Sequence, residues 1–203
     1  MRQQHTIASN ITEELVQRDP YLAKVIGHCG TITFPVYPDP FYSLVMSVVY
    51  QQLSFKGAET IFNRLIHAAG YPLEPDVLYE MMEEDFRSLG ISRQKAGYIH
   101  DICRHFQANP DRFHTLHLQP DDEVIATLTD IKGIGLWSAQ MFLMFTLIRP
   151  DVFPVGDLGI RKAMQRHCGL NADAPLNAYS EYAERWSPYR SFACHYLWHS
   201  HDK

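Results

Sequence analysis

The chain has few cysteines, and none of them forms a close pair that could bind a metal. Its 203 residues include four cysteines without a C-x-x-C pair, at Cys29, Cys103, Cys168 and Cys194. This spacing argues against the usual zinc sites and against four-cysteine iron–sulfur clusters. In a reducing compartment, all four side chains are expected to remain free thiols.

The chain also lacks long apolar runs and a positive net charge. No run approaches the roughly 18 residues that a membrane span needs, and residues 1–5 lead into no apolar signal core. We therefore expect a cytoplasmic protein, or a nuclear one in a eukaryote, with no membrane partner. The formal net charge of −5 argues against coating nucleic acid by bulk electrostatics. A local DNA site remains compatible with it, because basic residues outnumber acidic ones over 132–166.

Helix-forming patterns fill most of the sequence. Asp19-Pro20 and Asp39-Pro40 each place a capping carboxylate before a proline that suits a first helical turn. After Asp39, and again over 55–69, apolar residues recur at three- and four-residue spacing. Further helices are predicted over 76–82, 93–107, 120–129, 136–147, 157–167, 177–186 and 189–199. Residues 31–36 could be extended, but no alternating series builds a sheet, so we predict an all-α fold.

The predicted helices group into two subdomains of one unit, 1–203. Residues 1–38 have the pattern of a small helical arm, and the hydrophobic helix over 189–199 has no obvious partner nearby in sequence. We expect the chain ends to pack together, so that 1–38 and 157–203 form one subdomain and 39–156 the central one. A cleft between two such subdomains is a common place for a functional site.

The most informative segment is a turn with two glycines between helices, LTDIKGIGLWSA at 128–139. Gly133 and Gly135 can adopt backbone conformations closed to other residues and allow close approach of another surface. Ile131 and Ile134 would point inward and join the two helices. N–H groups at the start of the second helix suit a phosphate. The alternative is a plain helix–helix turn, since glycine commonly ends helices.

An aspartate follows the second helix of this hairpin after a stiff apolar loop. The loop, 152–155, contains Pro154 and leads through Gly156 to Asp157 at the start of a predicted helix. Asp157 has a simple interpretation as the N-cap of that helix. It could also be a carboxylate that faces a cleft whose other wall is the hairpin.

These segments resemble a known family of DNA repair enzymes. The order of hairpin, helix, proline-bearing loop and aspartate is similar to the helix-hairpin-helix (HhH-GPD) DNA glycosylase superfamily. IKGIGLWSAQMFL at 131–143, followed by RPDVFPVGDLGIRKAM at 149–164, resembles the 3-methyladenine DNA glycosylase II family. Residues 50–54 and 184–198 also resemble motifs of that family. Few residues precede Asp39, which corresponds to the compact form without an N-terminal β-rich domain.

The resemblance implies a monofunctional DNA glycosylase that acts in base excision repair. Such an enzyme flips an alkylated purine out of double-stranded DNA and hydrolyses its N-glycosidic bond. Asp157 would be the catalytic carboxylate, which stabilises positive charge on the sugar, orients the attacking water, or both. Trp137 stands where bifunctional relatives have a lysine nucleophile, so strand cleavage is not expected. The protein would be a monomer that requires no cofactor.

The resemblance also suggests which aromatic residues form the base pocket. An electron-poor base stacks well on aromatic faces, by cation–π attraction. The candidate pocket residues are Trp137, Trp198, Tyr50 and Tyr189. Each of these rings could instead belong to the core, because large rings are ordinary core residues.

A third set of residues would contact DNA. The candidates are Gln52, Leu53, Lys132, Gly133, Ile134, Gly135 and Arg161. Leu53 would fill the gap that the flipped base leaves, or else pack in the core beside Val49. In related enzymes the hairpin carbonyls hold Na⁺ or K⁺, which here would involve the carbonyls of Thr129, Ile131 and Ile134. Three histidines near the C-terminus, His195, His199 and His201, are expected at the surface rather than on a metal.

Other functions remain open from the sequence. A helix-hairpin-helix DNA-binding protein without catalysis would share the hairpin but would need neither Asp157 nor a pocket. A glycosylase for other damaged bases, such as 8-oxoguanine or mismatched bases, is disfavoured by Trp137. A helical scaffold for protein partners would expose an apolar patch and lack a phosphate site at the hairpin.

Overall fold

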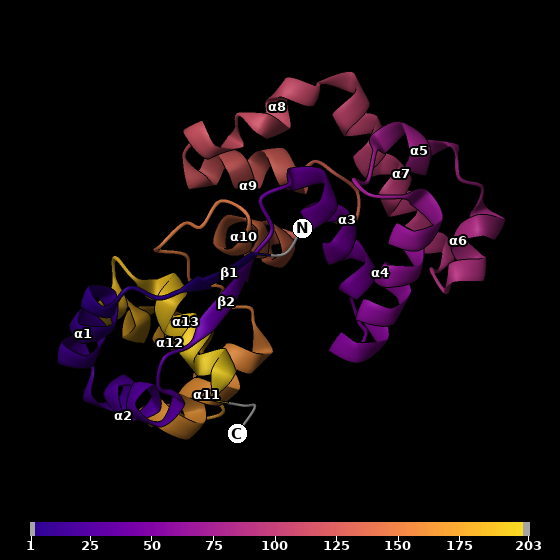
Figure 1. Cartoon of the computed structure of the whole chain (residues 1–203). Helices are drawn as coiled ribbons and strands as arrows, with labels where there is room; N and C mark the ends of the chain where they lie inside the picture. Colours follow the sequence, from indigo (N-terminus) through magenta and orange to yellow (C-terminus); the bar gives the residue numbers. More distant parts are fainter. Residues whose placement is uncertain (1–2, 201–203) are drawn as a thin grey trace. The chain divides into compact units, whose positions relative to one another are not determined.

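The computed structural model describes residues 3–200, except for the side chains of Phe55 and Pro110. Most of this stretch is helical (Figure 1), which confirms the predicted all-α fold. Within it, no helix combines the length and the apolar character that crossing a membrane requires. His201 lies outside the described residues.

The chain divides into two compact units. The first unit is Tyr37–Phe142, and the second combines the residues up to Val36 with those from Leu143 onwards. Both ends of the chain therefore share the second unit. The segment 143–156 lies with them, whereas the sequence analysis placed it in the central subdomain.

The first unit is built around a long helix, α7 (Arg93–Ala108), which packs against α3 (Pro40–Tyr50) and α5 (Pro75–Glu80). Fully buried side chains such as Leu65, Phe86 and Ile99 form its core. The other helices of this unit are α4 (Phe55–Ala69), α6 (Glu83–Leu89), α8 (Pro110–His114), the 3-10 helix η1 (Leu116–Leu118), α9 (Asp121–Thr129) and the first part of α10 (Leu136–Phe145).

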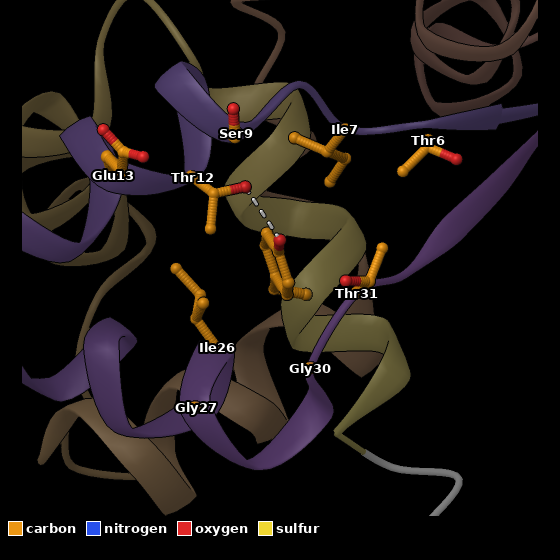
Figure 2. A pocket seen from close by; sticks show the side chains of 10 residues that line it. Thr6, Ile7, Ser9, Thr12, Glu13, Ile26, Gly27, Gly30 and Thr31 are labelled. Carbon is orange, nitrogen blue, oxygen red and sulfur yellow. Dashed lines mark hydrogen bonds between the residues drawn. The ribbon is translucent and has the colours of Figure 1, made fainter.

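In the second unit, α13 (Arg190–His199) packs against α2 (Pro20–Cys29) and α11 (Leu158–Cys168). The C-terminal helix thus finds its partner in the N-terminal arm, as the sequence analysis expected. In one such contact, Tyr196 of α13 shares a hydrogen bond of 3.0 Å with Thr12. Thr12 lies beside a cavity of about 520 Å³ (Figure 2). The other elements are β1 (Gln3–Thr6), α1 (Ser9–Arg18), β2 (Thr33–Val36), α12 (Leu176–Ala183) and the 3-10 helix η2 (Glu184–Trp186).

The structure adds short elements that the sequence did not predict, apart from β2, which lies within the stretch 31–36 that could be extended. Strands β1 and β2 pair antiparallel, with Gln3 opposite Val36. Only β2 buries apolar side chains, Phe34 and Val36, so β1 carries almost no sequence signal of its own. Helices α6 and α8 were also missed, because seven and five residues are too few for a periodic apolar pattern.

Both Asp-Pro pairs start helices in the predicted way. Asp39 accepts the Tyr42 N–H at 3.0 Å and caps α3. Asp19 caps α2 by accepting the Tyr21 N–H at 2.9 Å, and its second oxygen accepts the indole N–H of Trp186 at 2.8 Å. Because Asp19 and Trp186 are both fully buried, this carboxylate joins α2 to η2 in the core of the second unit.

The two caps predict different losses of stability. Asp19→Ala removes a cap and leaves the Trp186 N–H buried without an acceptor, so we expect a loss of about 3 kcal/mol in the free energy of unfolding. Asp39→Ala removes a cap alone and should cost about 1 kcal/mol. Chemical denaturation followed by circular dichroism measures both. Equal losses would show that the Asp19–Trp186 bond contributes nothing to stability.

Candidate active site

Asp157 occupies the N-cap position of α11 and is half-buried. Its Oδ1 atom accepts the Ile160 N–H at 2.8 Å, so the capping interpretation is confirmed. The same oxygen accepts the indole N–H of Trp198 at 3.1 Å. Two donors, one from α11 and one from α13, thus fix the orientation of the carboxylate. The structure therefore brings together Asp157, the predicted catalytic residue, and Trp198, a predicted pocket residue.

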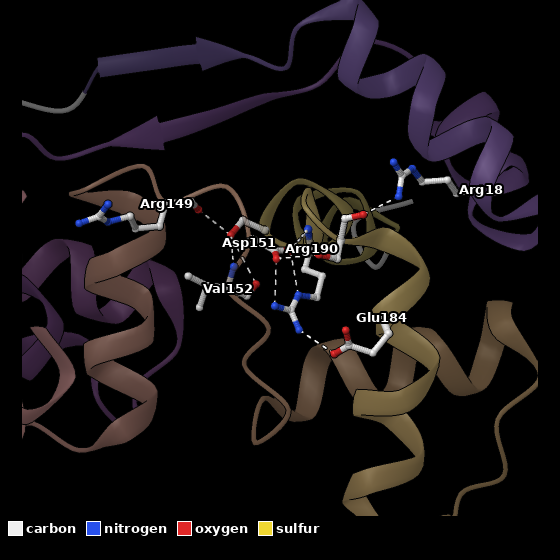
Figure 3. Close-up of polar contacts among 8 residues, drawn as sticks. Arg18, Arg149, Asp151, Val152, Glu184 and Arg190 are labelled. Carbon is white, nitrogen blue, oxygen red and sulfur yellow. Dashed lines mark hydrogen bonds and ion pairs between the residues drawn. The ribbon is translucent and has the colours of Figure 1, made fainter. Parts of the chain in front are cut away.

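The loop before Asp157 is held by an ion pair with the start of α13 (Figure 3). Asp151 accepts two hydrogen bonds from the Arg190 guanidinium, at 2.8 Å from Nε and 3.0 Å from Nη2. Partial burial alone would raise the pKa of Asp151, but the bonds from Arg190 and Ser187 hold that pKa below its ordinary value. Arg190 also bonds to Glu184 at 2.8 Å. The planar fork of arginine suits such a two-point grip.

Ser191 fastens the same loop at a second point. Its hydroxyl donates to the Arg149 carbonyl at 2.7 Å and accepts the Val152 N–H at 2.9 Å. Its own N–H donates to the Pro150 carbonyl at 3.0 Å. The loop therefore starts from a fixed position on the helix that carries Trp198. The roles of Asp151, Arg190 and Ser191 were not predicted from the sequence, although all three lie in the segments that carry the family resemblance.

Aromatic rings surround the indole of Trp198. Phe145 stacks on it with ring centroids 5.8 Å apart, and His195 lies against it at 5.7 Å. His195 also stacks on Phe34 at 4.4 Å and is only 4% exposed, so its predicted surface position was wrong. Burial lowers the pKa of His195 to about 3, so this ring is neutral at physiological pH and behaves as an aromatic core residue. Among residues 3–200 no cluster of side chains suited to a metal was found.

Gly159 provides the space in which Asp157 and Trp198 meet. A Cβ atom at this position would lie 3.1 Å from Asp157 Oδ1 and 3.5 Å from Trp198 Cδ1. Any larger residue would press against the hydrogen-bonded pair. The role of Gly159 was missed because its reason lies in a residue 39 positions later in the chain.

Two other predicted residues of the second unit have different surroundings. Tyr189 lies at the N-cap of α13, and its hydroxyl donates to Glu14 at 3.4 Å. Because an α-helix rises along its axis with every residue, Tyr189 lies about 13 Å from Trp198, at the other end of α13. Arg161 is half-buried and follows Asp157 by one turn of α11.

The hairpin lies in the first unit, between α9 and α10, and its two glycines differ. Ile131 and Ile134 are buried, as expected. Gly133 has φ +86°, and a Cβ there would overlap the ring of Tyr98. Gly135 has no positive φ, and a Cβ there would meet nothing within 4 Å. Only Gly133 therefore adopts a backbone conformation that favours glycine, whereas the described surroundings of Gly135 leave room for a side chain.

A buried carboxylate fixes the hairpin to α7. The Lys132 N–H donates to Asp101 Oδ2 at 2.8 Å, and the other oxygen of Asp101 pairs with Arg104. Asp101 is 7% exposed. The side chains of Lys132 and Trp137 are exposed to solvent.

The turn after α3 is tied to the same hairpin. Gln51 Nε2 donates to the Gly133 carbonyl at 2.8 Å, and Lys95 Nζ donates to the carbonyls of Val49 and Gln51, each at 2.8 Å. Burial lowers the pKa of Lys95. A lone lysine or glutamine gives no sequence signal for such a role, and both were missed.

The same turn carries three of the predicted site residues. Gln52 has φ +58°, which marks a sharp turn for a residue other than glycine. Leu53 is 43% exposed, whereas Val49 is fully buried, so the core alternative for Leu53 was wrong. Tyr50 is half-buried, with its ring edge-on to Phe62 at 6.2 Å between centroids.

Comparison with known proteins identifies the family. The model of the HhH-GPD superfamily of base excision DNA repair proteins matches residues 45–188. The Bacillus subtilis protein YfjP is 33% identical over 85% of this chain, which spans 62% of the length of that relative.

Two solved structures have the same fold. A DNA-3-methyladenine glycosidase from Bacillus halodurans has a TM-score of 0.81 and 36% identity, with 97% of this chain and 91% of that one covered. The Schizosaccharomyces pombe 3-methyladenine DNA glycosylase Mag1, solved in complex with abasic DNA, has a TM-score of 0.81 and 27% identity, with 94% and 95% covered. The family match includes the hairpin and Asp157, whereas Arg190, Ser191 and Trp198 lie beyond its last residue, 188. The chain belongs to the HhH-GPD superfamily of base excision DNA repair proteins.

Proposed function

We propose that this protein is a monofunctional DNA glycosylase that hydrolyses the N-glycosidic bond of alkylated purines, of the 3-methyladenine type, in double-stranded DNA. The observation that carries the proposal is the Asp157 carboxylate, which Ile160 and Trp198 hold in one orientation at the start of α11. The names of the two solved relatives, which are 3-methyladenine glycosylases, support this substrate class.

The carboxylate would act on the charge that forms as the base leaves. The bond from the sugar C1′ to the base nitrogen breaks, both electrons stay with the base, and the sugar becomes positively charged. A fixed negative charge stabilises that state, and it can also orient the water whose oxygen then bonds to C1′ and loses a proton. An alkylated purine is already cationic and leaves readily, so strong general-acid help is unnecessary.

The aromatic residues suit recognition of the base. Trp198 is held by its hydrogen bond to Asp157 and by stacking on Phe145. A cationic base gains free energy on such an electron-rich face. Trp137 at the start of α10 has no amine, so no Schiff base can form there and the reaction ends at an abasic site.

The hairpin and the turn beside it would hold the DNA. Gly135 leaves the start of α10 open, and main-chain N–H groups at a helix start suit a phosphate. We also propose that the carbonyls of Thr129, Ile131 and Ile134 hold Na⁺ or K⁺ when DNA binds. The Ile134 N–H donates to the Ile131 carbonyl at 3.1 Å and closes the turn between these two residues. The protein would act as a monomer.

The central test is base release by the wild type and by Asp157→Asn. Asparagine keeps the shape and an oxygen that can accept the Ile160 and Trp198 N–H groups, but it has no negative charge. We expect release of 3-methyladenine from methylated duplex DNA to fall at least about 100-fold, since the variant loses charge stabilisation of the transition state. Binding to a duplex with one abasic site should stay within about threefold, because charge neutralisation near phosphates does not weaken DNA binding.

Each result has a definite meaning. If the wild type and Asp157→Asn both bind the abasic duplex and neither releases a base, the glycosylase proposal fails. The protein is then a helix-hairpin-helix DNA-binding protein without catalysis. Release of 8-oxoguanine but not of methylated purines would support a glycosylase of a different specificity.

The two hairpin glycines predict opposite effects of alanine. Gly133→Ala should lower the free energy of unfolding by about 2–4 kcal/mol, because it strains the backbone and overlaps Tyr98. Gly135→Ala should leave stability within about 0.5 kcal/mol, as is usual for exposed positions, and should weaken abasic-duplex binding about tenfold. Thermal unfolding and fluorescence anisotropy measure the two effects. Unchanged DNA binding by Gly135→Ala would remove the hairpin from the DNA interface.

Leu53 predicts a change in activity without a change in stability. Leu53→Ala should keep the free energy of unfolding within about 0.5 kcal/mol, because the side chain is exposed. It should slow base release about tenfold under single-turnover conditions, since nothing would fill the gap left by the flipped base. Leu118→Ala, at a leucine that is 75% exposed on η1, is the matched control and should change neither quantity. A normal release rate for Leu53→Ala would exclude the wedge role.

A further inference from the structure

A groove runs along one side of α7 in the first unit. Its volume is about 640 Å³, and its lining residues are Arg93, Gln94, Gly97, Tyr98, Arg104 and Lys132. Five of these residues belong to α7, and Lys132 belongs to the hairpin. The groove is therefore continuous with the hairpin to which the proposed function assigns a DNA phosphate.

The charge of the lining favours an anionic ligand. Three of the six lining side chains are positive, and none is negative, in a chain whose net charge is −5. Arg104 is held in place by buried Asp101. Arg93 pairs with Glu83 at 3.1 Å, but both side chains are largely exposed, at 86% and 50%. Such an exposed ion pair contributes little free energy, so a phosphate can replace Glu83 as the partner of Arg93.

Gly97 stands in the middle of α7 with no internal reason for being glycine. It is exposed, and a Cβ there would meet nothing within 4 Å. Apart from proline, glycine is the least favourable residue in a helix interior. Among residues 3–200, no contact of Gly97 compensates for that cost. The missing side chain leaves the α7 backbone open to close approach by another molecule.

Contacts within the first unit hold α7 and the hairpin in one arrangement. The ring of Tyr98 lies directly beneath Gly133, and the Lys132 N–H bonds to Asp101 one turn further along α7. Tyr98 and Asp101 are three residues apart, so they lie on the same side of the helix as Gly97 and Arg104. A DNA strand bound at the hairpin would therefore continue along this side of α7.

We infer that α7 forms a second wall of the DNA interface, in which the groove holds the phosphodiester backbone next to the stretch bound by the hairpin. Arg93 and Lys132 bind successive phosphates, and Gly97 lets the backbone lie close to the helix. The inference rests on the proposed function, because it requires that the protein binds DNA.

The test measures binding of a fluorescent duplex with one abasic site by full-length variants at several salt concentrations. Arg93→Gln should weaken binding about three- to tenfold and reduce the slope of log K against log salt by about 0.9, which corresponds to one lost phosphate contact. Glu83→Gln should tighten binding, because it frees Arg93 to contact a phosphate. The gain should be only about two- to threefold, since an exposed ion pair contributes little free energy. Gly97→Gln should weaken binding about tenfold by filling the groove.

A matched glycine separates the effect on DNA from the effect on folding. Gly27 is also exposed within a helix, α2, and a Cβ there meets nothing within 4 Å. Gly27→Ala and Gly97→Ala should each raise the melting temperature by about 2–4 °C, since both relieve the cost of glycine in a helix. Only Gly97→Ala should weaken binding of the duplex.

The outcomes distinguish this inference from the proposed function. If the wild type binds DNA and releases methylated bases, but Arg93→Gln, Gly97→Gln and Gly97→Ala bind with unchanged affinity and salt slope, then α7 is no part of the interface and the glycosylase proposal stands. If the variants bind more weakly and still release bases at the wild-type rate once saturated with DNA, the inference is supported. A wild type that binds no duplex overturns both.

Discussion

The grip of Arg190 and Ser191 on residues 149–152 is the contact on which the arrangement of the Asp157 group depends. It fixes the loop that leads to Asp157 against the start of α13, and α13 carries Trp198 at its other end. Carboxylate and indole thus reach each other from two helices, α11 and α13, which also pack directly against each other. Because Asp151 and Arg190 are both mostly shielded from water, the pair is stronger than an exposed one and holds the loop in one conformation. Catalysis of the proposed kind requires such fixed geometry.

Glycine serves three different physical purposes in this protein. At position 133 it permits a backbone conformation and a close contact that the fold needs, and at 159 it leaves room for two side chains to bond. At 97 and 135 the protein itself makes no use of the missing side chain. The first two positions concern stability and assembly, whereas the last two concern what can approach from outside. The number of glycines in a motif does not reveal this difference. The atoms that a Cβ would contact at each position reveal it.

The sequence predicted what depends on local pattern and missed what depends on distant partners. Helix periods, the two Asp-Pro starts and the inward direction of Ile131 and Ile134 all follow from residues a few positions apart. Leu53 was left open between core and surface, since α3 ends at Tyr50 and the helical period does not extend to it. Lys95, Gln51 and Gly159 escaped notice, because each acts on an atom far away in the chain. His195 was misplaced for the same reason, since its partner Phe34 lies on a strand without a clear signal.

The composition of the second unit has a consequence for synthesis of the protein. Its arm, up to Val36, emerges from the ribosome before the helices it packs against, α11 and α13. The first unit, Tyr37–Phe142, is contiguous and can fold while the rest is still being translated. The arm meanwhile has exposed apolar side chains and must wait through more than half of the chain, a loop closure that slows folding. The hairpin belongs to the first unit, so a nascent chain acquires it before Asp157 and Trp198, which are 41 residues apart, have both emerged and can bond.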